Sequence, residues 1–68
     1  MKKRDWYTEL KTRLNRIWKS GVLTPANVNE LSMICDKISW CWKWKHITDT
    51  QKDELCQYAT ELWSLERA

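Results

Sequence analysis

The chain has 68 residues, of which 43% are hydrophobic and 31% are charged, and its formal net charge is +3. This size fits one small domain over residues 1–68, and the composition is too apolar for a disordered chain. The uncharged stretches are too short to span a bilayer, and no apolar run follows the opening Met-Lys-Lys-Arg-Asp, so we expect a cytoplasmic protein without a signal peptide.

The first predicted helix covers about residues 5–20. Its apolar residues recur at intervals of three and four, which aligns side chains along one side of a helix. These residues are Tyr7, Leu10, Leu14 and Ile17. Gly21 follows at the position where a left-handed residue commonly ends a helix. We expect residues 1–4, ahead of the helix, to form a frayed basic tail.

The second predicted helix covers about residues 25–45. Thr24 is a suitable N-cap, and Pro25 suits the first helical position. The same three–four spacing predicts a side that faces the core, made of Val28, Leu31, Cys35, Ile38 and Trp42.

The third predicted helix covers about residues 49–67. Thr48 and Gln51 have the spacing of a capping box at its start. Its apolar side consists of Leu55, Tyr58, Leu62 and Leu65. Three helices of this length with short connections predict an all-α fold, an antiparallel three-helix bundle.

Residues 38–47 also alternate between apolar and polar side chains, which is typical of a half-buried strand. We favour the helix because the segment continues a helical pattern without a breaker. A lone strand would also have nothing in this chain to pair with.

Six of the residues are tryptophan, an unusual number for so short a chain. Because successive helical residues turn by about 100°, Trp40 and Trp44 should lie nearly opposite the predicted core side. Met33 and Lys37 align with them, so the four residues form a second side that a three-helix bundle cannot bury. We predict that this side binds a protein, either a different one or a second copy of the chain, since tryptophan and methionine gather in interfaces. Alternatively, lysine stems cover the indoles of a lone subunit.

The charges suggest a competing function. Residues 1–20 carry seven basic and two acidic side chains, whereas residues 48–68 carry two basic and five acidic ones. Bases can stack on aromatic side chains while cations contact phosphates, so a nucleic acid is the alternative partner. Its candidate contacts are Arg13, Arg16, Lys19, Lys43 and Lys45. These basic residues can equally pair with the acidic third helix. A membrane surface is a weaker alternative, since basic and aromatic residues are not segregated.

Catalytic or metal chemistry has little support in the sequence. His46 is the sole histidine, and although Cys41 lies five positions before it, no third group is evident to orient a thiol–imidazole pair. The three cysteines have neither the close pairing of a zinc site nor the even number of a disulfide framework. We therefore expect reduced thiols, no metal, no cofactor and no catalytic residue.

In size and composition the chain resembles the short proteins of phages and mobile elements, many of which bind and block a host protein. That resemblance implies a small inhibitor or adaptor and transfers no residue roles. We therefore predict a non-catalytic protein-binding module that acts through Met33, Lys37, Trp40 and Trp44, on a different protein or as a homo-oligomer.

Overall fold

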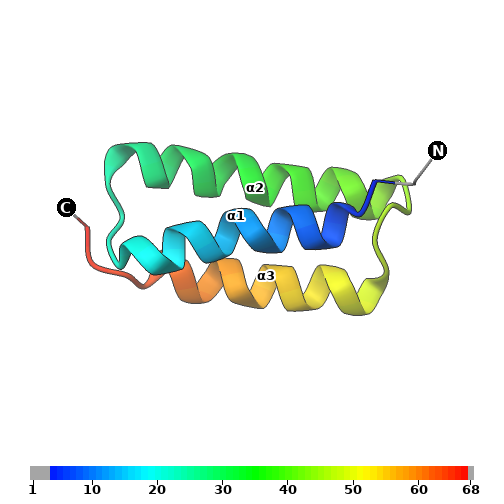
Figure 1. The fold of residues 1–68 in the computed structure, drawn as a ribbon. Helices are drawn as coiled ribbons and strands as arrows, with labels where there is room; N and C mark the ends of the chain where they lie inside the picture. The colour runs from blue at the N-terminus through cyan, green and yellow to red at the C-terminus, as the bar shows by residue number, and fades with distance from the viewer. Residues whose placement is uncertain (1–3, 68) are drawn as a thin grey trace.

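A computed structural model describes residues 4–67, which form three α-helices. They are α1 (Trp6–Ser20), α2 (Pro25–Lys43) and α3 (Asp49–Trp63). The helices lie side by side in alternating directions, and each one contacts the other two (Figure 1). The prediction of an antiparallel three-helix bundle is therefore confirmed. None of the described helices has both the length and the apolar character needed to cross a membrane.

Local side chains define where the helices begin. The Asp5 carboxylate accepts a hydrogen bond from the backbone N–H of Thr8, which caps α1. Thr24 caps α2 in the same way, with Pro25 at the first helical position. The capping box of Thr48 and Gln51 is present at α3, with both of its reciprocal hydrogen bonds formed. These contacts satisfy backbone donors that have no partner within a helix.

The helix ends depend on both local and distant contacts. Gly21 ends α1 in the left-handed region at φ 73°, as its position predicts. Helix α2 ends at Lys43, close to the predicted boundary, and Lys45 then turns the chain with φ 60°. Helix α3 ends at Trp63 rather than near residue 67. Beyond it, the backbone N–H of Leu23 donates to the carbonyl of Glu66 at 2.8 Å, so this tail pairs with the α1–α2 loop instead of continuing the helix.

Twelve buried side chains form the core of the described chain: Leu10, Leu14, Ile17, Leu23, Leu31, Ile34, Ile38, Cys41, Ile47, Leu55, Ala59 and Leu62. The predicted core side of α2 was partly wrong. Ile34 and Cys41 are fully buried, whereas Cys35 is half-buried and Trp42 is exposed. Both sets of residues follow a three–four spacing, so the sequence pattern did not distinguish them. The packing of α1 and α3 against α2 determines that the set with Ile34 and Cys41 is buried.

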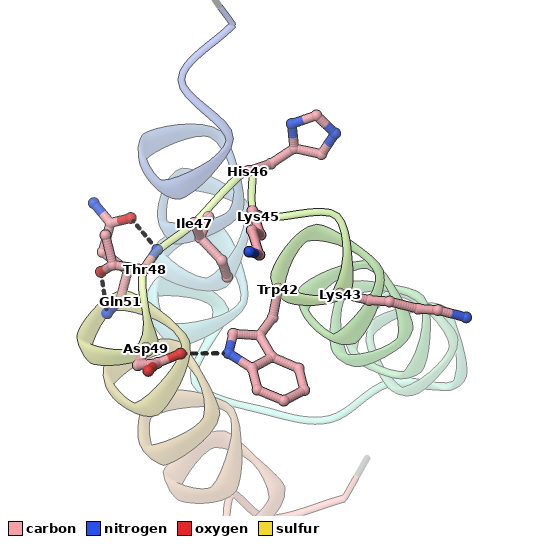
Figure 2. Close-up of a pocket in the computed structure, with 8 residues that line it drawn as sticks. All are labelled: Trp42, Lys43, Lys45, His46, Ile47, Thr48, Asp49 and Gln51. Atoms are coloured by element: carbon pink, nitrogen blue, oxygen red, sulfur yellow. Dashed lines mark hydrogen bonds between the residues drawn. The ribbon is translucent and has the colours of Figure 1, made fainter.

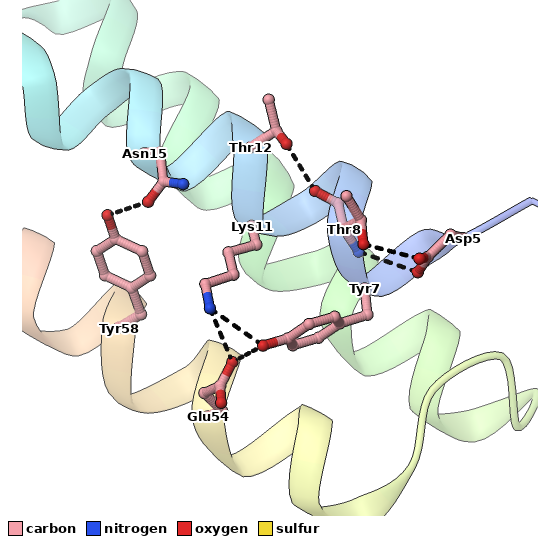
Figure 3. Close-up of polar contacts among 8 residues, drawn as sticks. All are labelled: Asp5, Tyr7, Thr8, Lys11, Thr12, Asn15, Glu54 and Tyr58. Atoms are coloured by element: carbon pink, nitrogen blue, oxygen red, sulfur yellow. Dashed lines mark hydrogen bonds and ion pairs between the residues drawn. The ribbon is translucent and has the colours of Figure 1, made fainter.

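Polar contacts join α1 to α3 (Figure 3). Tyr7 and Lys11 both contact the Glu54 carboxylate of α3, and the Tyr58 hydroxyl donates to the side-chain oxygen of Asn15. The two tyrosines are half-buried, because their rings pack against the core while their hydroxyls remain at the surface. The basic first helix is thus partly neutralised by the acidic third one.

Candidate interaction surface

Exposed apolar side chains are concentrated on α2. Five large hydrophobic residues are exposed in the described chain: Trp18 (54%), Met33 (54%), Trp40 (42%), Trp42 (44%) and Trp44 (60%). Four of them belong to α2 or to its C-cap residue, Trp44. Scattered single apolar side chains are ordinary on a protein surface, but several on one short helix are the usual mark of an interface.

Trp40 is held in place by aromatic neighbours from two other segments. Its indole meets that of Trp6 of α1 in a T-shaped arrangement, with ring centroids 5.7 Å apart, and the His46 imidazole stacks on it at 5.1 Å. The Lys37 ammonium lies 4.6 Å from the Trp40 ring centroid and 5.1 Å from that of Trp6. These contacts fix the orientation of the indole while a large part of it remains accessible.

A second cation, Arg4, packs on the aromatic cluster of Trp6, Trp40 and His46 next to the start of α1. The Arg4 guanidinium lies 4.1 Å from the Trp6 ring centroid and forms two hydrogen bonds of 2.6 Å with the Glu9 carboxylate. That hydrogen bonding lowers the pKa of Glu9 and raises that of Arg4. Residues 1–3 of the predicted frayed tail lie outside the described residues, whereas Arg4 makes defined contacts.

Met33, Lys37, Trp40 and Trp44 are named here the α2 face. Contact with Trp6 places Lys37 and Trp40 on the flank of α2 that adjoins α1, not opposite the core as expected. The reason is that α2 buries Ile34 and Cys41 rather than Cys35 and Trp42, which turns Trp40 toward α1. Lysine does cover Trp40 in part, but within residues 4–67 no aromatic or cation–π contact involves Trp44.

Trp42 lies on the other flank of α2, toward α3 (Figure 2). Its indole N–H donates to the Asp49 carboxylate at 2.6 Å, and the Lys52 ammonium lies 4.7 Å from its ring centroid. A cleft of about 650 Å³ opens beside it, with a lining that is mostly the α2–α3 turn: Trp42, Lys43, Lys45, His46, Ile47, Thr48, Asp49 and Gln51. Lys43 and His46 point away from Trp42, so they do not close over the indole.

The candidate nucleic-acid contacts do not form one surface. Arg13 pairs with Glu30 of α2 at 2.9 Å and is partly buried. Arg16 and Lys19 border a shallow depression beside Trp18, near the C-terminal end of α1. Lys43 and Lys45 lie by the α2–α3 turn, which is at the opposite end of the bundle (Figure 1).

Two of the three thiols, those of Cys35 and Cys41, are removed in part or fully from solvent. Burial raises the pKa of Cys35 and of Cys41, which reduces the thiolate fraction at neutral pH. His46 meets Cys41 through its backbone N–H, which donates to the Cys41 carbonyl at 2.8 Å, while its imidazole stacks on Trp40. Within the described residues, no group of three side chains has the arrangement of a metal site.

Comparison with known protein families, with curated proteins and with solved structures gave no match for this chain.

Two contributors to this surface were missed by sequence reasoning. The sequence pattern assigned neither Trp6 nor His46 to this surface, yet both pack on Trp40. The abundance of tryptophan was the one available signal, and it could not indicate which rings meet.

Proposed function

We propose that the protein is a non-catalytic binding module that engages a protein partner through the α2 face. The observation that carries the proposal is the joint exposure of Met33 and Trp44, by 54% and 60%, on the same side of one helix as Trp40. Aromatic residues and methionine are enriched in the buried centres of protein interfaces, where tryptophan often contributes most of the binding energy.

The packing around Trp40 supports this proposal. Its neighbours Trp6 and His46 restrict the indole before any partner arrives. A side chain that is already ordered loses less conformational entropy on binding, which would otherwise weaken association by about 0.5–1.5 kcal/mol per side chain. Trp44 is less restricted and offers the larger accessible area.

A protein partner suits the charges better than a nucleic acid does. Arg13 is already paired with Glu30, and the remaining candidate cations lie at two ends of the molecule. The indole of Trp42 has the Asp49 carboxylate beside it, which would repel a phosphate backbone. A module that works only through such a face would act as an adaptor or a small inhibitor.

The experiment places a photo-crosslinking residue at position 44 or, as a matched control, at position 18 in the chain within producing cells. Both positions hold an exposed tryptophan, but position 18 lies outside the α2 face. We expect discrete protein adducts from position 44 that Met33→Ala removes, and none from position 18. Equal adducts from both positions would contradict the proposal.

Two further measurements distinguish the remaining alternatives. The double variant Trp40→Ala with Trp44→Ala should retain its helical circular dichroism, and unfolding would mean that these residues act as core. Light scattering of the purified chain with a single-stranded oligonucleotide should show no complex. A complex that forms at low salt and disappears at moderate salt would instead identify a phosphate-driven nucleic-acid binder.

A further inference from the structure

The α2 face has a symmetric spacing. Its members Met33, Lys37, Trp40 and Trp44 are separated by four, three and four residues, so the spacing is the same in both directions along the helix. In an antiparallel pair of helices related by a two-fold axis, position 33 therefore opposes position 44 of the second copy. Position 37 likewise opposes position 40. This alternation of three and four residues is the seam of an antiparallel coiled coil.

The residues brought together in this register have complementary chemistry. Met33 would meet Trp44 of the second copy, and a thioether next to an indole is a favourable contact. Lys37 would oppose Trp40 of the second copy, while its ammonium keeps the contact with the Trp40 ring of its own chain at 4.6 Å. The outer two positions, 33 and 44, are the most exposed of the four and supply the apolar contact.

The flanking charges fit the same register. Asp36 and Lys43 are both exposed, and neither belongs to an ion pair in the part of the chain that the structure describes. When position 33 opposes position 44, position 36 opposes position 41 of the second copy. Lys43 is two residues beyond position 41, so Asp36 lies about 3 Å from it along the helix axis. The two-fold axis repeats this pair, and both pairs are between opposite charges. A parallel arrangement of the same helices would not align them.

The available area indicates a weak dimer. With Trp40 and Trp44 exposed by 42% and 60%, and an indole side chain burying up to about 250 Å², the two copies would together cover roughly 500 Å² of indole. That is about a third of a standard interface of ~1,600 Å², before Met33 and the flanking residues are added. Domains of this size also commonly gain stability from association.

We propose that the α2 face binds a second copy of the chain in an antiparallel, two-fold arrangement, with Asp36 of each copy paired to Lys43 of the other. This inference rests on the proposed function, because it names the partner of the same face.

The test reverses the two flanking charges one at a time. Sedimentation equilibrium of the purified wild-type chain should show a monomer–dimer equilibrium. Asp36→Lys alone and Lys43→Asp alone each turn both attractive pairs into repulsive ones, and each should raise the dissociation constant by at least about tenfold. An equimolar mixture of the two variants should associate again, because a copy of each restores both pairs. The chain that carries both substitutions should also dimerise by itself.

Circular dichroism verifies that each variant is folded. If a single variant is unstable, dimerisation of the chain that carries both substitutions still tests the predicted pairing of positions 36 and 43. Trp44→Ala should abolish dimerisation, whereas Trp18→Ala, the matched control, should leave the dissociation constant unchanged. A wild-type chain that stays monomeric at about 1 mM, or variants that do not complement one another on mixing, would overturn the antiparallel dimer. Discrete adducts from position 44 to a different protein would still support the proposed function, so the two failures are separable.

Discussion

At the end of the bundle that holds the α1–α2 loop, Leu23 is buried and its backbone N–H donates to the carbonyl of Glu66. At the other end, Ile47 is buried within the α2–α3 turn. The first end is fastened further by the Asn27 amide, which donates to the Ser20 hydroxyl and to the Val22 carbonyl. The second end has three exposed indoles around it.

This difference shows how a small bundle can keep a stable core and still present an apolar surface. Backbone and amide hydrogen bonds close the first end with few exposed apolar groups. At the second end, side chains rather than backbone groups cover the core. Trp40 and Trp42 each pack on one flank of α2, and part of each indole stays accessible. The candidate interaction surface thus arises where closure depends on large aromatic side chains.

The largest expected effect comes from removing the buried aliphatic side chain at either end. Leu23→Ala should lower the free energy of unfolding by about 2–5 kcal/mol, because it deletes a fully buried side chain and leaves a cavity. Ile47→Ala should cost less within that range, since Ile47 is 5% exposed and Leu23 only 1%. Urea denaturation measures both, and a greater loss for Ile47→Ala would mean that the second end is the more tightly packed one.

The backbone at the two ends should respond in opposite directions. Gly21 has φ 73° and a Cβ added there would meet no atom within 4 Å, so Gly21→Ala should destabilise the protein through backbone strain alone, by about 1 kcal/mol. Lys45 has φ 60°, so Lys45→Gly should relieve similar strain and stabilise the protein by roughly 0.5–1 kcal/mol. Thermal unfolding measures both, and destabilisation by Lys45→Gly would show that its side chain contributes more than the strain costs.

A smaller effect should follow from the indole N–H of Trp42. Trp42→Phe keeps an aromatic ring but leaves Asp49 without this donor, at a cost of about 0.5–1.5 kcal/mol, nearer the lower value because the bond is exposed. Trp18→Phe is the matched control at the first end and should change the free energy of unfolding little. Equal losses in the two variants would show that ring size matters and the hydrogen bond does not.

The smallest effect should be a change in acid sensitivity. The Arg4 hydrogen bonds lower the pKa of Glu9 below its ordinary value of 4.5, so the folded state favours the ionised carboxylate. This contribution is complete above pH 4.5 and is lost as the pH falls through the lowered pKa of the folded state. Arg4→Ala should therefore flatten the fall in stability on the acid side of pH 4.5. Urea midpoints between pH 6 and pH 3 measure this, and an unchanged slope would exclude the pair as its source.

The sequence predicted the elements that depend on neighbouring residues. Thr24, Thr48 and Gln51 cap helices through groups only a few positions away, and Gly21 adopts its left-handed conformation without help from distant contacts. The exposure of Met33, Trp40 and Trp44 was likewise predicted from spacing, because residues one turn apart on a helix lie on the same side. These features are local, so the sequence by itself was sufficient to predict them.

Tertiary structure decided which of two equivalent patterns on α2 became core. Burial of Ile34 and Cys41, rather than Cys35 and Trp42, requires all three helices to pack at once. The same packing brought Trp6 and His46 onto Trp40, and the bond between Leu23 and Glu66 ended α3 early. Such contacts join residues far apart in the chain, and their geometry follows from how the helices rotate to fill the core, which no local spacing specifies.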